Sequence, residues 1–472
     1  MLCLRLFCCC AALLVCGCLS PTYTPPQLNE PVPQEFKHAG DWKPATPGDT
    51  LDRGNWWKKF NDPGLNELME QLNAGNQKVA LAAASFRQMR SQVDAARSSF
   101  FPTLSLPGTV QRADAGSGIT NTYSYGLRSS WEVNFWNTIP AFDAAKAAEA
   151  SSAADYATMR LAMQAELAQS YFQLRTLDVQ HALYESTIAA FAKGVQLTRS
   201  QYLGGIVTPA DVAQAEAQLA AAEAQMADID RQRAQMESAI AILVGQLPST
   251  FSLAPATLTS TLPVVPRDLP PALLERRPDI ASAERQVAVA NEKIGLARAA
   301  WFPSITLNGE ALNKAATWMA APVTVWSMGP TAALSLFEGG KRIAESDAAQ
   351  AGFEAAVASY RQTVLEGFKE VEDNLAALNF LATQAEAQNR AVTASQMALR
   401  LSLSQYKGGL TTYLQVVSTQ ATALSNQRSA IQIEGQRLIA TVNLIKALGG
   451  GWNAEALKAL TTGKGPQEGL LP

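Results

Sequence analysis

Apolar residues recur along the chain with two different periods. Six stretches are predicted to be helical from the spacing of their apolar residues, namely 61–98, 141–203, 208–245, 272–298, 340–407 and 411–448. Four stretches between them alternate apolar and polar residues and are predicted strands, namely 102–113, 122–135, 303–312 and 323–337. The helices 141–203 and 340–407 lack proline and would reach roughly 95–100 Å. Helices of this length have to lie side by side in a bundle or a barrel.

The sequence repeats itself once, at an offset of about 200 residues. Residues 96–104 return as 297–305, and residues 200–206 return as 404–410. Such a collinear duplication predicts that both halves share one order of elements: helix, two strands, very long helix, tight turn, helix. The predicted organisation is a signal peptide at 1–17, a lipidated extended segment at 18–60, repeat 1 at 61–250, a linker at 251–271, repeat 2 at 272–450 and a tail at 451–472.

The predicted strands suggest a membrane barrel. Tyr123, Tyr125 and Leu127 alternate with small, polar or charged residues, as in a strand with an apolar outer face and a wet inner face. Five tryptophans that could form aromatic girdles flank or lie in the strands: Trp131, Trp136, Trp301, Trp318 and Trp326. The four strands of one chain are too few to close into a β-barrel. A sheet with unpaired edges is not tolerated in lipid. Three chains would supply twelve strands, so we expect a homotrimer with a shared β-barrel.

The first residues resemble those of an exported lipoprotein. An apolar run follows Arg5 and ends in Cys16, Gly17 and Cys18, a layout too short for a membrane-spanning helix and typical of a signal peptide. All of the chain's 6 cysteines lie within residues 1–18. We expect Cys18 to be diacylated and to anchor the protein in the outer membrane, with Leu19 permitting that destination. The alternative is that Cys18 is one more signal-peptide cysteine.

Charge and composition exclude several functions. The formal net charge is −3, from 38 basic and 41 acidic residues, and no basic block or stripe points to nucleic acid. The 2 histidines, His38 and His181, have no cysteine or second histidine nearby, so we expect no metal site, no catalytic residues and no cofactor. Carboxylates such as Glu370 and Asp373 are expected on a solvated helix face.

Two motifs resemble those of the TolC-type outer-membrane efflux protein family. They run from Leu273 to Ile280 and from Leu334 to Arg342, and the likeness extends from about Trp56 to Trp452. Residues 23–26 resemble the NodT-like lipoprotein branch that serves resistance–nodulation–division pumps, although residues 134–140 depart from the usual pattern. The resemblance implies a mixed α/β membrane protein: a trimeric 12-stranded β-barrel, four strands per chain, continued by a long periplasmic α-helical barrel.

The resemblance also implies a function and partners. Such a protein is the passive exit duct of a tripartite efflux system, together with a periplasmic membrane-fusion adaptor and an inner-membrane resistance–nodulation–division pump. The alternatives are a lipid-anchored coiled-coil protein that spaces envelope layers, or the same fold serving type I protein secretion or metal export. The alternating strands argue against the coiled-coil spacer.

The turns between the paired helices are the candidate functional residues. Gly204 and Gly205 suit the end of a helix, and Thr208, Pro209 and Asp211 suit the start of the next as N-cap, N1 and N3. The resemblance implies that the turns meet the adaptor through Gly204, Gly205, Ile206, Val207, Thr208, Gly408, Gly409, Leu410 and Thr411. The alternative is that these residues only form stable turns.

The resemblance further implies a gate just behind the turns. The candidate gate residues are Asp211, Tyr406, Gln415 and Ser418. Thr411 stands where related proteins carry a basic residue, and Gln415 and Ser418 stand where they often carry aspartates. We therefore expect few contacts between charged residues to hold the gate closed. We expect it to be closed mainly by packing of Ile206, Val207 and Leu410.

Overall fold

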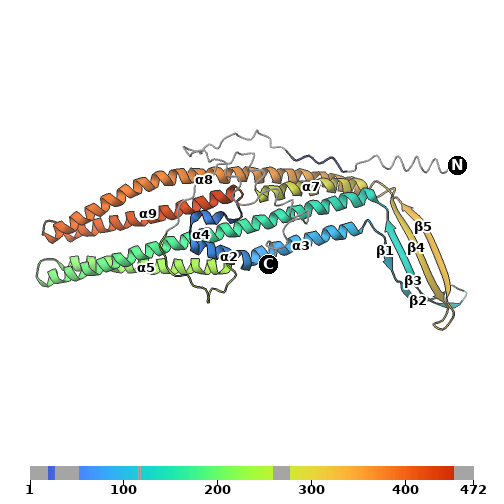
Figure 1. Ribbon diagram of the computed structural model, residues 1–472, viewed down its shortest axis with the longest axis horizontal. Coiled ribbons are helices and arrows are strands. Elements are labelled where there is room, and N and C mark those ends of the chain that lie inside the picture. The colour runs from blue at the N-terminus through green and yellow to red at the C-terminus, as the bar shows by residue number, and fades with distance from the viewer. Residues whose placement is uncertain (1–19, 27–52, 115, 117, 259–276, 451–472) are drawn as a thin grey trace. The chain divides into compact units, whose positions relative to one another are not determined.

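The computed structural model describes residues 20–26, 53–114, 116, 118–258 and 277–450 (Figure 1). The predictions for the signal peptide, for Cys18, for most of 18–60, for much of the linker and for the tail therefore lie outside the described residues. Two compact units are present. The strand unit contains 20–26, 84–154 and 279–363, and the helix unit contains 53–83, 155–258, 277–278 and 364–450. No helix within the described ranges is both long and apolar enough to cross a membrane.

The strand unit holds one antiparallel sheet with the order β1–β3–β4–β5 (Figure 1). Its strands are β1 (Thr103–Ser105), β2 (Gly108–Asp114), β3 (Ile119–Glu132), β4 (Ser304–Ala315) and β5 (Val323–Ala333). The continuous strand predicted at 102–113 is wrong, because β1 and β2 are separated at Pro107, which has no N–H for a ladder. The Pro107 carbonyl instead accepts the Gly126 N–H at 3.2 Å.

The predicted alternation is confirmed as two chemically different faces of this sheet. Leu127 pairs with Ala311, which pairs with Trp326, so these side chains share what we call the apolar face. On the opposite, polar face, the Arg128 guanidinium lies 3.2 Å from the Glu310 carboxylate. One face thus suits lipid and the other suits water.

The helices are α2 (Pro63–Gly75), α3 (Gln77–Ser98), α4 (Phe135–Leu203), α5 (Pro209–Leu243), α7 (Pro278–Ala299), α8 (Lys341–Lys407) and α9 (Tyr413–Ala447), with a 3₁₀ helix η1 at Arg53–Phe60. The single helix predicted at 61–98 is wrong, since α2 and α3 meet at Asn76. The Asn76 side chain accepts the Val79 N–H at 3.0 Å and donates to the Leu243 carbonyl at 2.7 Å. Asn76 therefore caps α3 and ties it to the end of α5.

Helix α4 also begins earlier than the predicted residue 141. The Asn134 carbonyl accepts the N–H groups of Asn137 and Thr138, both at 2.9 Å, which starts the helix before Pro140. The Asn134 side chain accepts the Ile305 N–H at 2.6 Å, so this buried amide joins the helix start to β4. Asn134 lies within the stretch in which the sequence departs from the TolC-type pattern.

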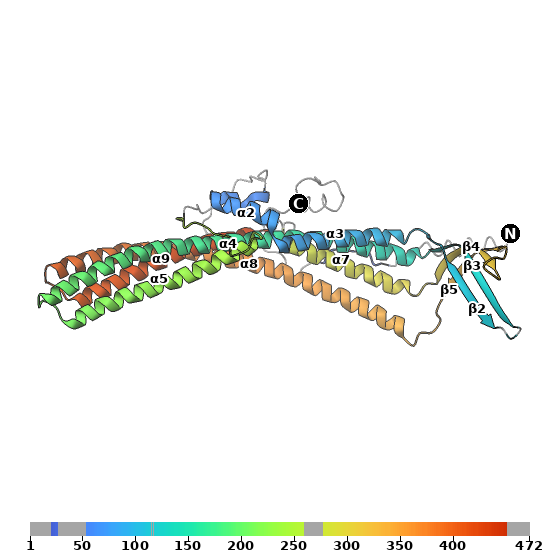
Figure 2. The same cartoon turned by 90° about the horizontal axis from the view of Figure 1, so that it is seen from below.

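Within the helix unit, the α4–α5 hairpin lies beside the α8–α9 hairpin in both views (Figures 1 and 2). The main core packs η1 and α2 against α4, with the rings of Phe60 and Phe172 centred 5.0 Å apart. Gly435 on α9 lets that helix approach α4, because a Cβ there would collide with the Thr176 side chain. A residue without a side chain at this position thus allows α9 and α4 to pack closely.

Candidate functional site

The first hairpin turn, between α4 and α5, is a glycine-capped helix end. Gly205 has φ +69°, which only glycine adopts without strain. The N–H of Gly205 donates to the Tyr202 carbonyl, and the N–H of Ile206 donates to the Gln201 carbonyl, both at 2.9 Å. This pair of bonds satisfies carbonyls that would otherwise lack partners at the end of α4.

Helix α5 then begins with the predicted capping arrangement. The Asp211 carboxylate accepts the Thr208 N–H at 2.9 Å and the Thr208 hydroxyl at 2.8 Å. Thr208 is the N-cap, and Pro209 occupies the first turn of α5. The Asp211 carboxylate is therefore engaged within its own turn.

The second hairpin turn, between α8 and α9, repeats the glycine cap and lacks the capping box. Gly409 has φ +73°, and the Leu410 N–H donates to the Gln405 carbonyl at 2.9 Å. Thr412 is the N-cap, but its side chain makes no capping hydrogen bond. Gln415 stands where the first turn has Asp211, so the reciprocal carboxylate contact is lost.

Behind the turns, a pair of tyrosines joins the two hairpins. The Tyr406 hydroxyl on α8 donates to the Gln201 side-chain oxygen on α4 at 2.6 Å. The rings of Tyr406 and Tyr413 are centred 5.4 Å apart, and both side chains are buried with Val195 and Val416. Burial raises the pKa of both phenols. A hydrogen bond with the Thr198 side chain lowers the pKa of each phenol, and the negative charge of Asp211 raises it.

The structure brings together only some of the predicted gate residues. Asp211 lies close enough to influence Tyr406 electrostatically, but the Tyr406 hydroxyl bonds to Gln201. Gln415 and Ser418 are exposed on α9, and their side chains form no hydrogen bond with any described residue. Sequence reasoning missed Gln201 and Tyr413. Tyr413 follows the N-cap Thr412 directly, and its position beside the turn was the available signal.

The turns expose their apolar side chains in the single chain. Ile206 is 74% exposed and Leu410 is 82% exposed, whereas Val207 and Thr411 are half-buried. Exposed apolar groups gathered at two neighbouring turns are typical of a contact surface.

The segment that follows Cys18 lies along α7 in the strand unit. The Ser20 hydroxyl donates to Glu292 at 2.6 Å, and the Tyr23 hydroxyl donates to Glu284 at 2.5 Å. The Asn291 side chain donates to the Pro21 carbonyl at 2.9 Å. Burial and the bond to Glu284 raise the pKa of Tyr23. This segment is thereby fixed two residues beyond Cys18.

Sequence reasoning also missed a buried ionic cluster that holds the chain after α5. The Asp178 carboxylate on α4 accepts hydrogen bonds from the guanidinium groups of Arg175 at 2.8 Å and Arg233 at 2.7 Å. It also accepts the Ala256 N–H at 3.1 Å. The Asp178 side chain is only 2% exposed. Among the described residues, no group of three or more histidines, cysteines, aspartates and glutamates is arranged to hold a metal ion.

Comparison with known proteins identifies the family. The profile described as "Outer membrane efflux protein" matches residues 68–246 and 269–450. The chain belongs to the outer membrane efflux protein family. The predicted relationship to TolC-type and NodT-like proteins is confirmed, and the protein is an efflux channel of the outer membrane.

Relatives cover nearly the whole chain. The pyoverdine export outer membrane protein OpmQ of Pseudomonas aeruginosa is 30% identical over 463 residues, 94% of this chain and 96% of the relative. The toluene efflux pump outer membrane protein TtgC of Pseudomonas putida is 30% identical over 457 residues, 93% of this chain and 94% of the relative. The structure of the outer-membrane channel OprN matches with a TM-score of 0.84 and 28% identity, covering 92% of this chain and 100% of that one.

The efflux-family motif around Arg277 has a structural role. The buried Arg277 guanidinium donates to Glu370 on α8 at 2.7 Å and to the Ala447 carbonyl at the end of α9 at 3.1 Å. Glu370 lies on a solvated face, as expected, with its side chain 43% exposed, and its carboxylate also compensates the buried Arg277 charge. Within the helix unit, Arg277 thus joins the two helices of the second hairpin to each other.

Proposed function

We propose that this efflux channel works as a homotrimer in which three copies of the sheet close into one 12-stranded barrel. The observation that carries the proposal is the sheet itself, which has an apolar face, a polar face and two edges. β1 and β2 both pair with β3, one after the other along its length, and form one edge, and β5 forms the other, so each copy is four strands wide. In lipid each unpaired backbone group costs several kcal/mol, so an edge strand needs the opposite edge of a neighbouring copy.

Cys18 is the proposed lipid anchor of this assembly in the outer membrane. The contacts of Ser20 and Tyr23 with α7 support that role, because they hold the chain beside its own strand unit directly after the anchor. The helix unit then extends into the periplasm as a helical barrel.

The two hairpin turns are the proposed contact with a periplasmic membrane-fusion adaptor, which links the channel to an inner-membrane resistance–nodulation–division pump. Exposed Ile206 and Leu410 supply apolar contacts, and the glycine caps keep the turns narrow. Two relatives are named for different cargoes, pyoverdine and toluene. Cargo selection therefore belongs to the pump, and the channel is a passive duct.

The proposed gate is closed by packing at the tip. Ile206, Val207 and Leu410 close the pore, and Tyr406 holds the hairpins together behind them. Asp211 stabilises the turn and does not act in the gate, since its carboxylate already accepts hydrogen bonds from the N–H and the hydroxyl of Thr208.

The decisive experiment measures the mass of the full chain after detergent extraction from outer membranes, by native mass spectrometry. The expected result is a mass of three chains that survives mild denaturation. A monomer or a dimer as the dominant species would overturn the shared barrel. A Cys18→Ala variant, made in parallel, should still form trimers that stay in the membrane through salt washing, but it should no longer incorporate radiolabelled palmitate.

A further inference from the structure

A polar pocket lies between three helices of the helix unit, away from the hairpin turns. Its volume is about 240 Å³, and α4, α5 and α9 line it. Glutamines come from every wall: Gln173 and Gln180 from α4, Gln225 and Gln232 from α5, Gln432 and Gln436 from α9. A space of this size lined by amides can hold a small molecule that forms several hydrogen bonds.

The pocket carries one carboxylate, Asp228, and one guanidinium, Arg428, and the two charges lie close enough to influence each other. The Asp228 carboxylate accepts hydrogen bonds from the Arg231 guanidinium at 2.6 Å and from the Gln232 side-chain amide at 2.7 Å. These bonds keep the pKa of Asp228 below its usual range. Arg428, by contrast, forms no hydrogen bond or ion pair with any residue that the structure describes. The charge of Arg428 acts on Asp228 only through space, and its N–H groups have no hydrogen-bond partner among the described residues.

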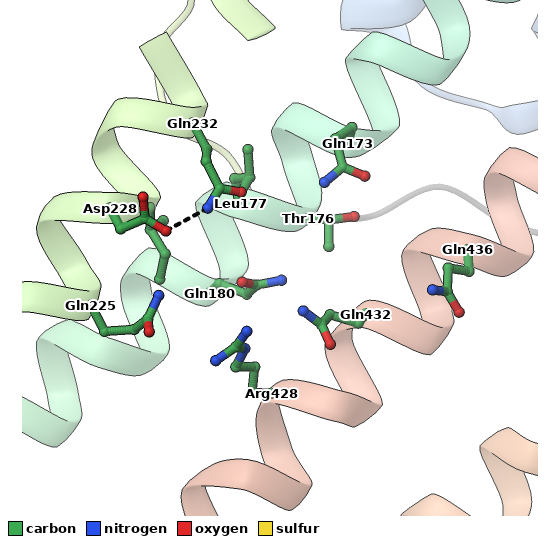
Figure 3. Close-up of a pocket in the computed structure, with 11 residues that line it drawn as sticks. Gln173, Thr176, Leu177, Gln180, Gln225, Asp228, Gln232, Arg428, Gln432 and Gln436 are labelled. Carbon is green, nitrogen blue, oxygen red and sulfur yellow. Dashed lines mark hydrogen bonds between the residues drawn. The ribbon is translucent and has the colours of Figure 1, made fainter. Parts of the chain in front are cut away.

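Gln180 is the second sign that the pocket takes a ligand. Its side chain is only 5% exposed, yet it has no hydrogen-bond partner among the described residues. Figure 3 shows the Gln180 amide pointing into the space that Arg428 and Gln432 also face. The Gln180 amide atoms reach the pocket space, so a molecule bound there can complete their hydrogen bonds.

We propose that this pocket binds a small polar carboxylate. Arg428 binds the carboxylate through its forked N–H groups, and Gln180 and the other glutamines bind the polar remainder of the molecule. The volume exceeds what a lone inorganic anion needs, and the amides match hydroxyl or amide groups on an organic ligand. All of the residues that line the pocket belong to one chain.

The test uses glucuronate as the probe and glucose as its neutral counterpart, because they share a ring with hydroxyls and differ in the carboxylate. Binding to the purified full-length protein is measured by isothermal titration calorimetry, in a detergent without a sugar headgroup. We expect glucuronate to bind at least tenfold more tightly than glucose, since hydrogen bonds to charged groups are the strong ones.

Arg428→Gln should weaken glucuronate binding roughly tenfold to a hundredfold and leave glucose binding unchanged. Arg437→Gln is the matched control, because Arg437 lies on the same helix and pairs with Glu434 at 3.0 Å. Gln180→Leu, which keeps the side-chain size, should weaken both probes. Equal affinity for the two sugars, no measurable glucuronate binding, or an equal loss in Arg437→Gln would each overturn the proposal.

Discussion

The Tyr406 hydroxyl on α8 lies 2.6 Å from the Gln201 side-chain oxygen on α4 and donates a hydrogen bond to it. The two residues precede equivalent glycine turns in the two halves of the chain, so this bond links the hairpins just behind their tips. Any opening that moves one hairpin away from the other has to break it.

Tyr406→Phe should therefore favour the open tip. The lost bond is worth about 1 kcal/mol, which corresponds to a roughly fivefold change in the ratio of open to closed channels. Uptake of a large antibiotic by cells that carry the variant measures the leakage. Tyr202→Phe removes an exposed phenol from the same turn and should not change uptake. Equal leakage in both variants would show that the Gln201 bond does not hold the tip.

The tyrosine pair also predicts how leakage depends on pH. Folding raises the pKa of Tyr406 and Tyr413 above the usual value of 10.0, mainly through burial. The neutral phenols stabilise the tip fully below pH 10.0, and this stabilisation is lost as the pH rises through their raised pKa values. Leakage in planar bilayers should stay flat from about pH 6 to about pH 9. A rise near pH 8 that Tyr406→Phe abolishes would contradict this.

Asp211→Ala should leave resting leakage nearly unchanged. The Asp211 carboxylate bonds only within its own turn among the described residues, so its removal costs α5 a capping interaction of about 1 kcal/mol. The measurement is antibiotic uptake, beside Leu410→Asp, which places a charge among the apolar tip residues and should increase leakage. Strong leakage from Asp211→Ala alone would show that a charged lock closes the gate.

The features that the sequence predicted correctly, the first hairpin turn and the two faces of the sheet, depend on interactions between residues close together in the chain. Glycine pairs followed by Thr208 and Pro209 indicated the first turn, because its hydrogen bonds join residues a few positions apart. Alternation indicated the two faces of the sheet for the same reason. The break between α2 and α3 had a local signal in the capping residue Asn76, and the break between β1 and β2 had one in Pro107, which lacks an N–H. The longer periodic pattern around each residue obscured these signals.

Contacts between distant segments could not be predicted in this way. Asp178 meets Arg233 and Ala256 only after α4, α5 and the following chain have packed together. Glu370 has a charge at ordinary helix-surface spacing, and only the fold brings the buried Arg277 to it. The glutamine pocket likewise needs three helices, since no single segment shows that Gln180 lacks a partner.

Asp178→Asn should destabilise the helix unit. The Asp178 carboxylate compensates Arg175 and Arg233 in a buried site, and loss of one partner from such a cluster costs roughly 3–5 kcal/mol. The measurement is the temperature at which the detergent-extracted protein loses its native assembly. Asp373→Asn removes an exposed partner of Lys369 and should lower that temperature little. Equal shifts in the two variants would show that the Asp178 cluster adds nothing specific.

Two neighbouring positions on β5 test which face of the sheet meets lipid. Met328 pairs with Gly309 on the apolar face and is 83% exposed in the single chain, whereas Ser327 pairs with Glu310 on the polar face. Met328→Arg should reduce the fraction of trimer in outer membranes, because an arginine facing lipid costs about 2–4 kcal/mol near the middle of the bilayer. Ser327→Arg should assemble normally, because the new guanidinium lies across from the Glu310 carboxylate. Fractionation of outer membranes followed by native electrophoresis measures both. If Ser327→Arg is the variant that fails, the apolar face points toward the pore, and the shared-barrel proposal has to be abandoned.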